Sequence, residues 1–473
     1  MLLHTEKDQF TPKEIVEAIK KHELKVVPGQ DELWQYYKAK NPTILDKKKP
    51  DPNNPDNRTP VPYGRKIVTT FVGYAYRPGY ITYKSEEKEY IAQLKATFKA
   101  NNEHIKTSRA GRNTGIFGEA YEIVYIDGVL TADQQIPVKA EPRFFSVDPR
   151  EVILYYDYSP EPKKKIGIRY YKPSDDLWKV EAYYADRVIK YDIDKSAKHQ
   201  SMSPTGADWK IEQTETATNF FANIPIVAYY FGDDMLGIIE PVVPLIDDYD
   251  ILVSDSINEF DRFANAYLLL AKMSLTDPML KKEPGAVSRA LRYLKQRRVF
   301  EQLPSTDAVK FLTKDIPSEF MEYMAELIRK QIHTQSHVPD FTDDSFGGTI
   351  SGVAVQRLLF DFENVVSSAE ADFDVGLYER IDLLNEFYKS AGRVTGDAVI
   401  IDHKRNLPTD IQEFATTAKL MSDAGFSRKV VAETMPDEVI PDADEELARQ
   451  EEDADREISG MMRTEQDRGD DEA

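Results

Sequence analysis

Carboxylates crowd one short stretch of this sequence and are the first candidates for chemistry. Four aspartates lie close together there: Asp247, Asp248, Asp250 and Asp255. Such a density of acidic groups can hold the divalent cations of a metal-dependent nuclease. The stretch IDDYDILVSD also alternates aspartate with aliphatic residues, which is typical of a helix with a solvated face. We favour the solvated helix face and keep the nuclease as the alternative.

Two histidines form a second candidate site. His333 and His337 are four residues apart in a segment that we predict to be helical, so both imidazoles could reach one metal ion. No glutamate follows His333 as an H-E-x-x-H motif requires, and no third ligand lies nearby in the sequence. We therefore predict polar histidines at an interface and no metal site.

The motifs of common enzyme classes are missing from the sequence. FGGTISG lacks the lysine of the phosphate-binding loop motif G-x-x-x-x-G-K-[ST], and GRNTG lacks the spacing of that motif. The G-x-S-x-G motif of serine hydrolases does not occur either. The chain has no cysteine, which excludes disulfides and thiolate ligands. We predict no catalytic residue, no bound cofactor and no enzymatic activity.

The composition restricts the partners and the compartment. The formal net charge is −21, whereas a protein that grips DNA usually carries a basic footprint. No apolar run is long enough for a membrane span, and MLLHTEKDQF does not resemble a signal peptide. We expect a protein without a membrane partner that is soluble in the cytoplasm when it is made.

The first part of the chain reads as helices. Thr11, Pro12 and Glu14 form a helix start with a capping box, and further helices are expected at Asp31–Lys40 and Glu86–Asn101. Asp46–Pro60 is rich in proline, asparagine and charge, so we expect an exposed loop. Tyr63–Tyr83 reads as an apolar helix that breaks near Pro78 and is followed by a short strand.

The middle of the chain changes to a strand pattern. Short runs rich in Tyr, Val and Ile, such as EAYEIVYID and EVILYYDYS, predict an antiparallel meander or small sandwich over about 119–231, with a hairpin tip at Ser201–Asp208. The second half returns to helices. They are expected at Val243–Ala271, Ser318–Ser336, Ser351–Ser390, Asp410–Ala424 and Ser427–Met435, before an acidic tail.

Four segments resemble, in the same order, those of portal proteins of long-tailed phages of Gram-positive hosts. They are YGRKIVTTFVGYAYRPGYITYKS, GEAYEIVYID with FFSVDPREVILYYD, VPDFTDDSFGGTISGVAVQRLLF and AVIIDHKRNLPTDIQEFATTAKLM. The likeness extends over about Pro12–Leu447. It implies an α+β portal fold with a wing of helices and antiparallel strands, an α-helical stem, an α/β clip and a mainly helical crown.

The resemblance also implies regions and partners. The regions would be a wing over 1–242, a stem helix over 243–271, a clip over 272–317 and a second stem helix over 318–339. They would continue with a tunnel loop over 340–352, a long wing helix over 353–390, a wing strand and the crown over 391–447, and an acidic, disordered tail over 448–473. The family forms a dodecameric ring at one capsid vertex of the virion. Double-stranded DNA is packaged through that ring by terminase and later ejected, and head-completion proteins, scaffold and major capsid protein contact it.

Three sets of residues acquire roles through the resemblance. The DNA-facing tunnel loop would contain Asp340, Phe341, Asp343, Asp344, Phe346, Gly347, Gly348 and Ile350. The clip would dock partners through Lys281, Lys282, Arg289, Arg292, Lys295, Arg297 and Arg298. The stem would present an acidic face that does not hold phosphate, made of Asp247, Asp248, Asp255 and Glu259. A capsid adaptor ring without a DNA path remains a further alternative.

Overall fold

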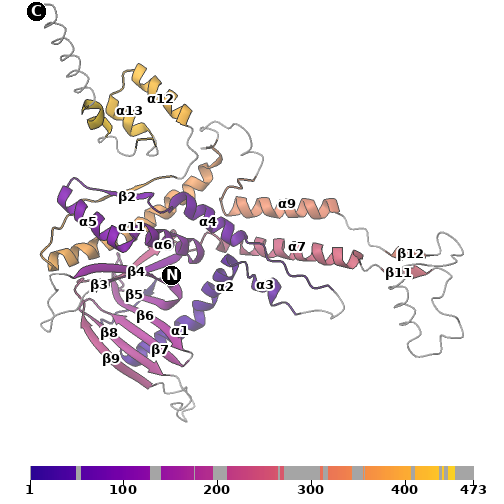
Figure 1. The fold of residues 1–473 in the computed structure, drawn as a ribbon. Coiled ribbons are helices and arrows are strands. Elements are labelled where there is room, and N and C mark those ends of the chain that lie inside the picture. Colours follow the sequence, from indigo (N-terminus) through magenta and orange to yellow (C-terminus); the bar gives the residue numbers. More distant parts are fainter. Residues whose placement is uncertain are drawn as a thin grey trace, which may run out of the picture. The chain divides into compact units, whose positions relative to one another are not determined.

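A computed structural model describes residues 2–48, 55–127, 140–174, 176–194, 210–264, 267–270, 309–312, 318–342, 355, 357–405, 411–435, 439–440 and 446–452 (Figure 1). Two compact units make up the chain. The first contains Met1–Gly347 and Leu358–Lys404, and the second contains Gly348–Arg357 and Arg405–Ala473. Within the described residues, no helix combines the length and the apolar character needed to cross a bilayer.

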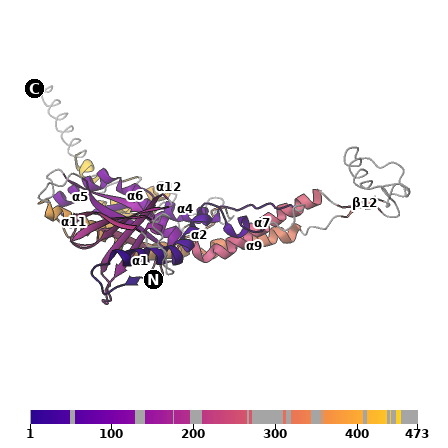
Figure 2. The ribbon, with the colours of Figure 1, turned by 90° about the horizontal axis from the view of Figure 1, so that it is seen from below.

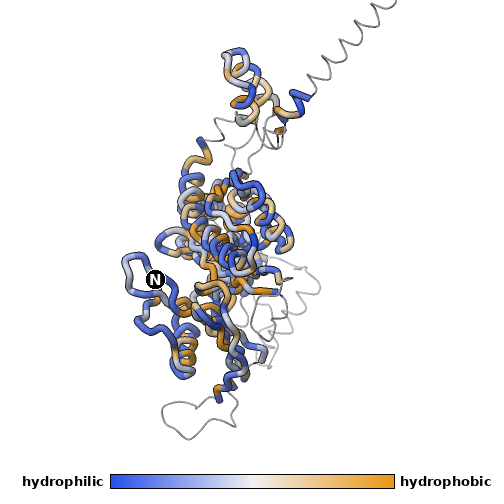
Figure 3. Tube along the Cα trace, turned by 90° about the vertical axis from the view of Figure 1, so that its left-hand side faces the viewer, coloured by the Kyte–Doolittle hydropathy of each residue, from blue (hydrophilic) through white to orange (hydrophobic). Residues whose placement is uncertain are grey.

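The first unit begins with a series of helices. They are α1 (Pro12–Lys25), α2 (Val27–Tyr37), α3 (Pro42–Leu45), α4 (Tyr63–Ala75), α5 (Lys88–Asn101) and α6 (Glu103–Phe117). The capping box predicted at Thr11 is confirmed, because the Thr11 side chain accepts from the backbone of Glu14 and the Glu14 carboxylate accepts from the backbone of Thr11. Figure 3 shows apolar and polar stretches alternating along the helices, as expected for elements with one buried side.

Helix α6 was not predicted, since its glycines disfavour a helix in isolation. Two of these glycines are needed for close packing against α4 and the turn that follows it. A Cβ atom at Gly111 would lie 2.5 Å from the Tyr76 ring, and one at Gly115 would lie 3.3 Å from Phe71. Tertiary packing therefore overrides the local propensity in α6.

The predicted antiparallel meander is confirmed as most of a six-stranded sheet. Its strands, in spatial order, are β1 (Leu3–His4), β5 (Val152–Tyr156), β6 (Lys164–Ser174), β7 (Leu177–Tyr183), β8 (Arg187–Asp194) and β9 (Lys210–Thr218). Strand β1 is parallel to β5, and the others are antiparallel. Ile15 and Ile19 of α1 pack on one face, against a cluster that includes Trp178. The predicted hairpin tip at Ser201–Asp208 lies outside the described residues.

A second sheet has three strands in the order β10 (Ile226–Tyr230), β3 (Glu119–Asp127) and β4 (Glu141–Val147). Tyr121 and Ile123 of β3 share an apolar cluster with Leu154 and Tyr156 of β5, so the two sheets pack face to face. The other face of β3 carries Glu122, which bonds to Arg380 of helix α11 (Phe360–Ser390).

The second half of the first unit contains two long helices that lie side by side, α7 (Val243–Ala264) and α9 (Ser318–Gln335) (Figures 1 and 2). The prediction that the first helix extends to Ala271 is wrong. Tyr267–Leu270 forms strand β11, which pairs with β12 (Val309–Leu312) in register Tyr267↔Leu312. The apolar run YLLL finds a cross-strand partner there, and this pairing stabilises a strand over a continued helix.

Of the long third helix predicted over Ser351–Ser390, residues 355, 357 and 358 are helical, Leu359 is a buried turn residue, and α11 begins at Phe360. Strand β13 (Ile400–His403) pairs with β2 (Ile81–Lys84) at the end of the first unit. The second unit contains α12 (Ile411–Asp423) and α13 (Arg428–Thr434), close to the small helices predicted there.

Candidate functional site

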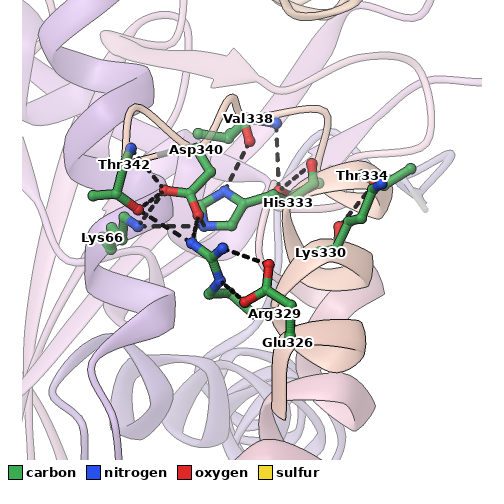
Figure 4. A network of polar contacts seen from close by, with 10 residues as sticks. Lys66, Glu326, Arg329, Lys330, His333, Thr334, Val338, Asp340 and Thr342 are labelled. Atoms are coloured by element: carbon green, nitrogen blue, oxygen red, sulfur yellow. Dashed lines mark hydrogen bonds and ion pairs between the residues drawn. The ribbon is translucent and has the colours of Figure 1, made fainter. Parts of the chain in front are cut away.

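Helix α9 leads directly into the segment predicted to be a tunnel loop, and the first residue of that segment, Asp340, is fixed by several contacts (Figure 4). Its Oδ1 atom accepts from Lys66 Nζ at 3.1 Å, from Thr342 N at 3.2 Å and from Thr342 Oγ1 at 2.7 Å. Its Oδ2 atom accepts from Arg329 Nη1. One carboxylate therefore connects α4, α9 and the start of the loop.

His333 completes this group, which we call the loop-root cluster (Lys66, Arg329, His333, Asp340 and Thr342). His333 Nδ1 lies 2.9 Å from the carbonyl oxygen of Val338, and Nε2 lies 3.3 Å from Lys66 Nζ. The ammonium group can only donate, so Nε2 accepts and the proton sits on Nδ1. Burial lowers the pKa of His333, which agrees with a neutral ring.

These contacts also decide the metal hypothesis for the two histidines. Both ring nitrogens of His333 are engaged, and His337 is exposed with a positive φ of 57° beyond the end of α9. Within the residues that the structure describes, no group of three or more His, Cys, Asp or Glu side chains could hold a metal ion.

The electrostatics of the loop-root cluster keep Asp340 ionised. Burial alone would raise the pKa of Asp340, but hydrogen bonds from Thr342 and Lys66 outweigh it, and the pKa lies well below its ordinary value. Arg329 is also bonded to Glu326, which raises the pKa of the guanidinium further. Only 10% of the Asp340 side chain is exposed. Within the subunit, the Asp340 carboxylate thus binds two protein cations. That Asp340 faces the DNA stays a prediction.

A pocket beside the loop-root cluster is lined by residues that flank the predicted loop in the chain. Asp340 lines it from the beginning of the loop, and Leu358 and Asp361 line it from the segment after the loop. Phe341 is exposed. The remaining residues predicted for the loop lie outside the described residues: Asp343, Asp344, Phe346, Gly347, Gly348 and Ile350. All seven predicted clip residues also lie outside them.

The sequence suggested that the acidic residues of α7 share one face, but the structure places them on different sides of the helix. Asp247 accepts from Tyr36 Oη at 2.7 Å and from Thr43 Oγ1 at 3.1 Å. Asp250 is fully buried, and it accepts from Asn41 Nδ2 and from the backbone of Val61, both at 2.8 Å. The interpretation as part of a solvated face is wrong for Asp250, which is buried and accepts from Asn41 and Val61, whereas Asp247 is partly exposed.

Further along α7, the same side of the helix binds an extended segment. The Thr59 backbone donates to Ser254 Oγ at 3.0 Å, and the Asn57 backbone donates to Asn258 Oδ1 at 2.7 Å. Described residues 55–60 of the predicted exposed loop are therefore half-buried against α7. Asp248 and Asp255 are exposed on another side of the helix, and Glu259 is partly exposed. Of the four residues predicted for the acidic stem face, Asp248 and Asp255 are exposed, and Asp247 and Glu259 are partly exposed on different sides of α7.

Residues 16–460 match the family model "Phage portal protein, SPP1 Gp6-like". The chain belongs to the SPP1 Gp6-like family of phage portal proteins. No curated protein matches it. One similar solved structure is the "Neck of native GTA particle computed with C12 symmetry", with 10% identity, a TM-score of 0.42, and coverage of 86% of this chain and 93% of that chain.

Membership in the portal family confirms the resemblance noted in the sequence. This portal protein is a structural component of the virion, a ring-forming subunit of the capsid vertex through which DNA passes, and it is not an enzyme. The nuclease and the adaptor without a DNA path are thereby set aside. The sequence reasoning missed the loop-root cluster. The one local signal for it was Asp340 followed by Thr342, since aspartate readily accepts from a backbone two residues on.

Proposed function

We propose that twelve copies of this portal protein form a channel in which α7 and α9 are the stem, 272–317 is the clip and 340–352 faces the DNA. The wing would comprise 1–242 and 353–390, and 391–447 would contain a further wing strand and the crown. The family match over residues 16–460 is the observation that carries this proposal. The pairing of α7 with α9, and the position of the loop directly after α9, support the regional assignment.

The charges near the loop are suited to a passage that does not hold DNA. Free lysines and arginines would neutralise phosphates, and a ring would multiply that affinity by its copy number. Lys66 and Arg329, next to the loop, are instead bound to Asp340 and Glu326. The exposed Asp248 and Asp255 would repel phosphate further along the stem. The duplex would therefore meet few available cations there.

The clip would provide the basic surface that this region lacks. Its predicted docking residues, Lys281 through Arg298, would attract terminase during packaging and head-completion proteins afterwards. Reversal of Arg297 and Arg298 to glutamate is expected to leave rings intact and to weaken terminase binding in a pull-down. Unchanged binding would contradict this assignment of the clip.

Deletion of Phe341–Ile350 tests the DNA-facing role of the loop most directly. Particles should still assemble, because the ion pairs of Asp340 with Lys66 and Arg329 are kept, but packaged DNA per particle should fall at least about tenfold. Removal of Ser201–Asp208, in the predicted hairpin tip of the wing, serves as the control and should leave packaging unchanged. Normal packaging by the loop deletion would refute the DNA-facing role.

A further inference from the structure

The two edges of the three-stranded sheet are covered by different helices. The middle of α11 packs along β10, where a Cβ atom at Gly376 would lie 2.4 Å from Tyr229 and 2.7 Å from the Ala228 carbonyl oxygen. Helix α5 packs against β4, at the other edge. Beyond Gly376, α11 crosses toward β4 and α5, since Arg380 lies over the Phe144 ring of β4 and Tyr388 Oη donates to Thr97 of α5.

Side chains block both edges against further strand pairing. On β10, the Lys164 ammonium donates to the carbonyl oxygen of Ile226, and Glu379 accepts from the backbone of Ala228. On β4, the side chain of Asn101 bonds to the backbone of Pro142 and of Phe144. A neighbouring copy cannot add a strand at either edge, so any contact there must use the outer helix faces and the side chains.

The outer face at β10 is acidic with an apolar centre. We call it the α11 patch, and it consists of Asp233, Asp372, Val375 and Tyr378. Val375 is 67% exposed and Tyr378 is 44% exposed, one helical turn apart. Asp233 is exposed in the turn after β10, and burial together with the charge of Asp233 raises the pKa of Asp372. An exposed pair of large apolar side chains with this rim is typical of a protein contact.

The outer face at β4 has the opposite charge. We call it the α5–α6 patch, and it consists of Lys99, Ile105, Arg109 and Arg143. Ile105 is an exposed apolar residue, and Lys99 and Arg109 are exposed cations. Arg143 connects α5 to the sheet, since it donates to the Ala100 carbonyl oxygen at 2.6 Å, and its Nε lies 3.5 Å from the carboxylate of Asp127. A basic patch is notable on a chain with a net charge of −21.

We propose that the α11 patch of one copy docks on the α5–α6 patch of the next copy around the ring. This inference rests on the ring of the proposed function and names its contact surfaces in the wing. The two patches lie at opposite edges of one sheet and have opposite charges and apolar centres, as a head-to-tail contact that closes a ring requires. A two-fold pairing of like patches would place carboxylates against carboxylates, so the occupant of each patch is the complementary patch of a second copy.

A charge swap tests the pairing. The variant Lys99→Glu/Arg109→Glu is acidic at both edges, and the variant Asp233→Lys/Asp372→Lys is basic at both edges. Each variant alone should show at least about a tenfold lower ring fraction than the wild type by mass photometry. An equimolar mixture should recover rings, because alternating subunits restore complementary charges at every contact of an even-numbered ring.

Controls separate folding from docking and this interface from the ring itself. Lys13→Glu/Lys21→Glu, which makes the same charge change on exposed positions of α1, should form rings like the wild type. Circular dichroism should show that both edge variants are folded. Wild-type rings together with unaffected edge variants, or with folded variants that the mixture does not rescue, would overturn the interface alone. A wild type that forms no rings would overturn both the proposed ring and this interface.

Discussion

Two ionic clusters in this portal protein differ in their ratio of cations to carboxylates. In the core, the guanidinium of Arg380 bonds to two carboxylates, with Nε at 2.7 Å from Glu122 and Nη1 at 3.0 Å from Glu103. At the loop root, the carboxylate of Asp340 bonds to two cations, Lys66 and Arg329. Arg380 is fully buried, whereas Lys66 and Arg329 keep 40% and 25% of their side chains exposed.

The difference in burial separates a fixed joint from one that can open. Water cannot replace the partners of Arg380, so separating α11 from α6 and β3 would leave bare charges in the core. At the loop root, water can solvate Lys66 and Arg329 as they leave Asp340, so opening this cluster would not leave its cations bare. We infer that the core cluster maintains the fold and that the loop-root cluster holds the start of the segment that we propose to face the DNA.

The largest effect is expected from Arg380→Met. This change leaves Glu103 and Glu122 buried without their cation and should lower the free energy of unfolding by about 3–5 kcal/mol. Urea denaturation of the purified protein measures it. The triple variant Arg380→Met/Glu103→Gln/Glu122→Gln should recover part of the loss. A loss below about 1 kcal/mol for the single variant would show that the core cluster is not a fixed joint.

An intermediate effect is expected from Asp250→Ala on α7. The buried backbone N–H of Val61 and the side chain of Asn41 would lose their acceptor, which should cost about 1–3 kcal/mol. Asp250→Asn keeps one acceptor oxygen and should cost less. Thermal unfolding compares the two variants. Equal stability of Asp250→Ala and the wild type would mean that the extended segment does not depend on this residue.

A smaller loss of stability is expected from Asp340→Ala, about 1 kcal/mol or less, because both cations can turn to water. Its effect on DNA packaging should be larger, since the start of the loop loses its attachment to α4 and α9. Stability and packaged DNA per particle are both measured. Thr342→Val, which removes one donor and keeps the ion pairs, provides a milder control. A large destabilisation without a packaging defect would reverse the distinction between the clusters.

The smallest effect is expected from Asp248→Ala/Asp255→Ala, within about 0.5 kcal/mol of the wild type, because both residues are exposed. If these residues face the DNA, the variant should package with a stronger dependence on salt concentration, since two sources of phosphate repulsion per subunit are gone. Packaging at low and high salt measures this. A destabilisation close to that of Asp250→Ala would mean that the two sides of α7 are not distinct.

Local signals in the sequence predicted much of the fold. The cap at Thr11 and the strands rich in Tyr, Val and Ile depend on neighbouring residues, and both were found as expected. The contacts of Arg380 depend on residues 258 and 277 positions away, which no local pattern reveals. Asp250 was misjudged for the same reason, since its donors belong to a segment about 190–210 positions earlier in the chain. Helix α6 escaped prediction because its glycines are selected by packing.

The central claim is that copies of this protein enclose an open passage for DNA. Negative-stain images of the purified protein, averaged along the particle axis, test it most directly. We predict ring-shaped particles with twelve-fold symmetry and a central hole wide enough for a DNA duplex. Particles that remain monomeric at every concentration, or rings whose centre is closed by protein, would contradict the claim.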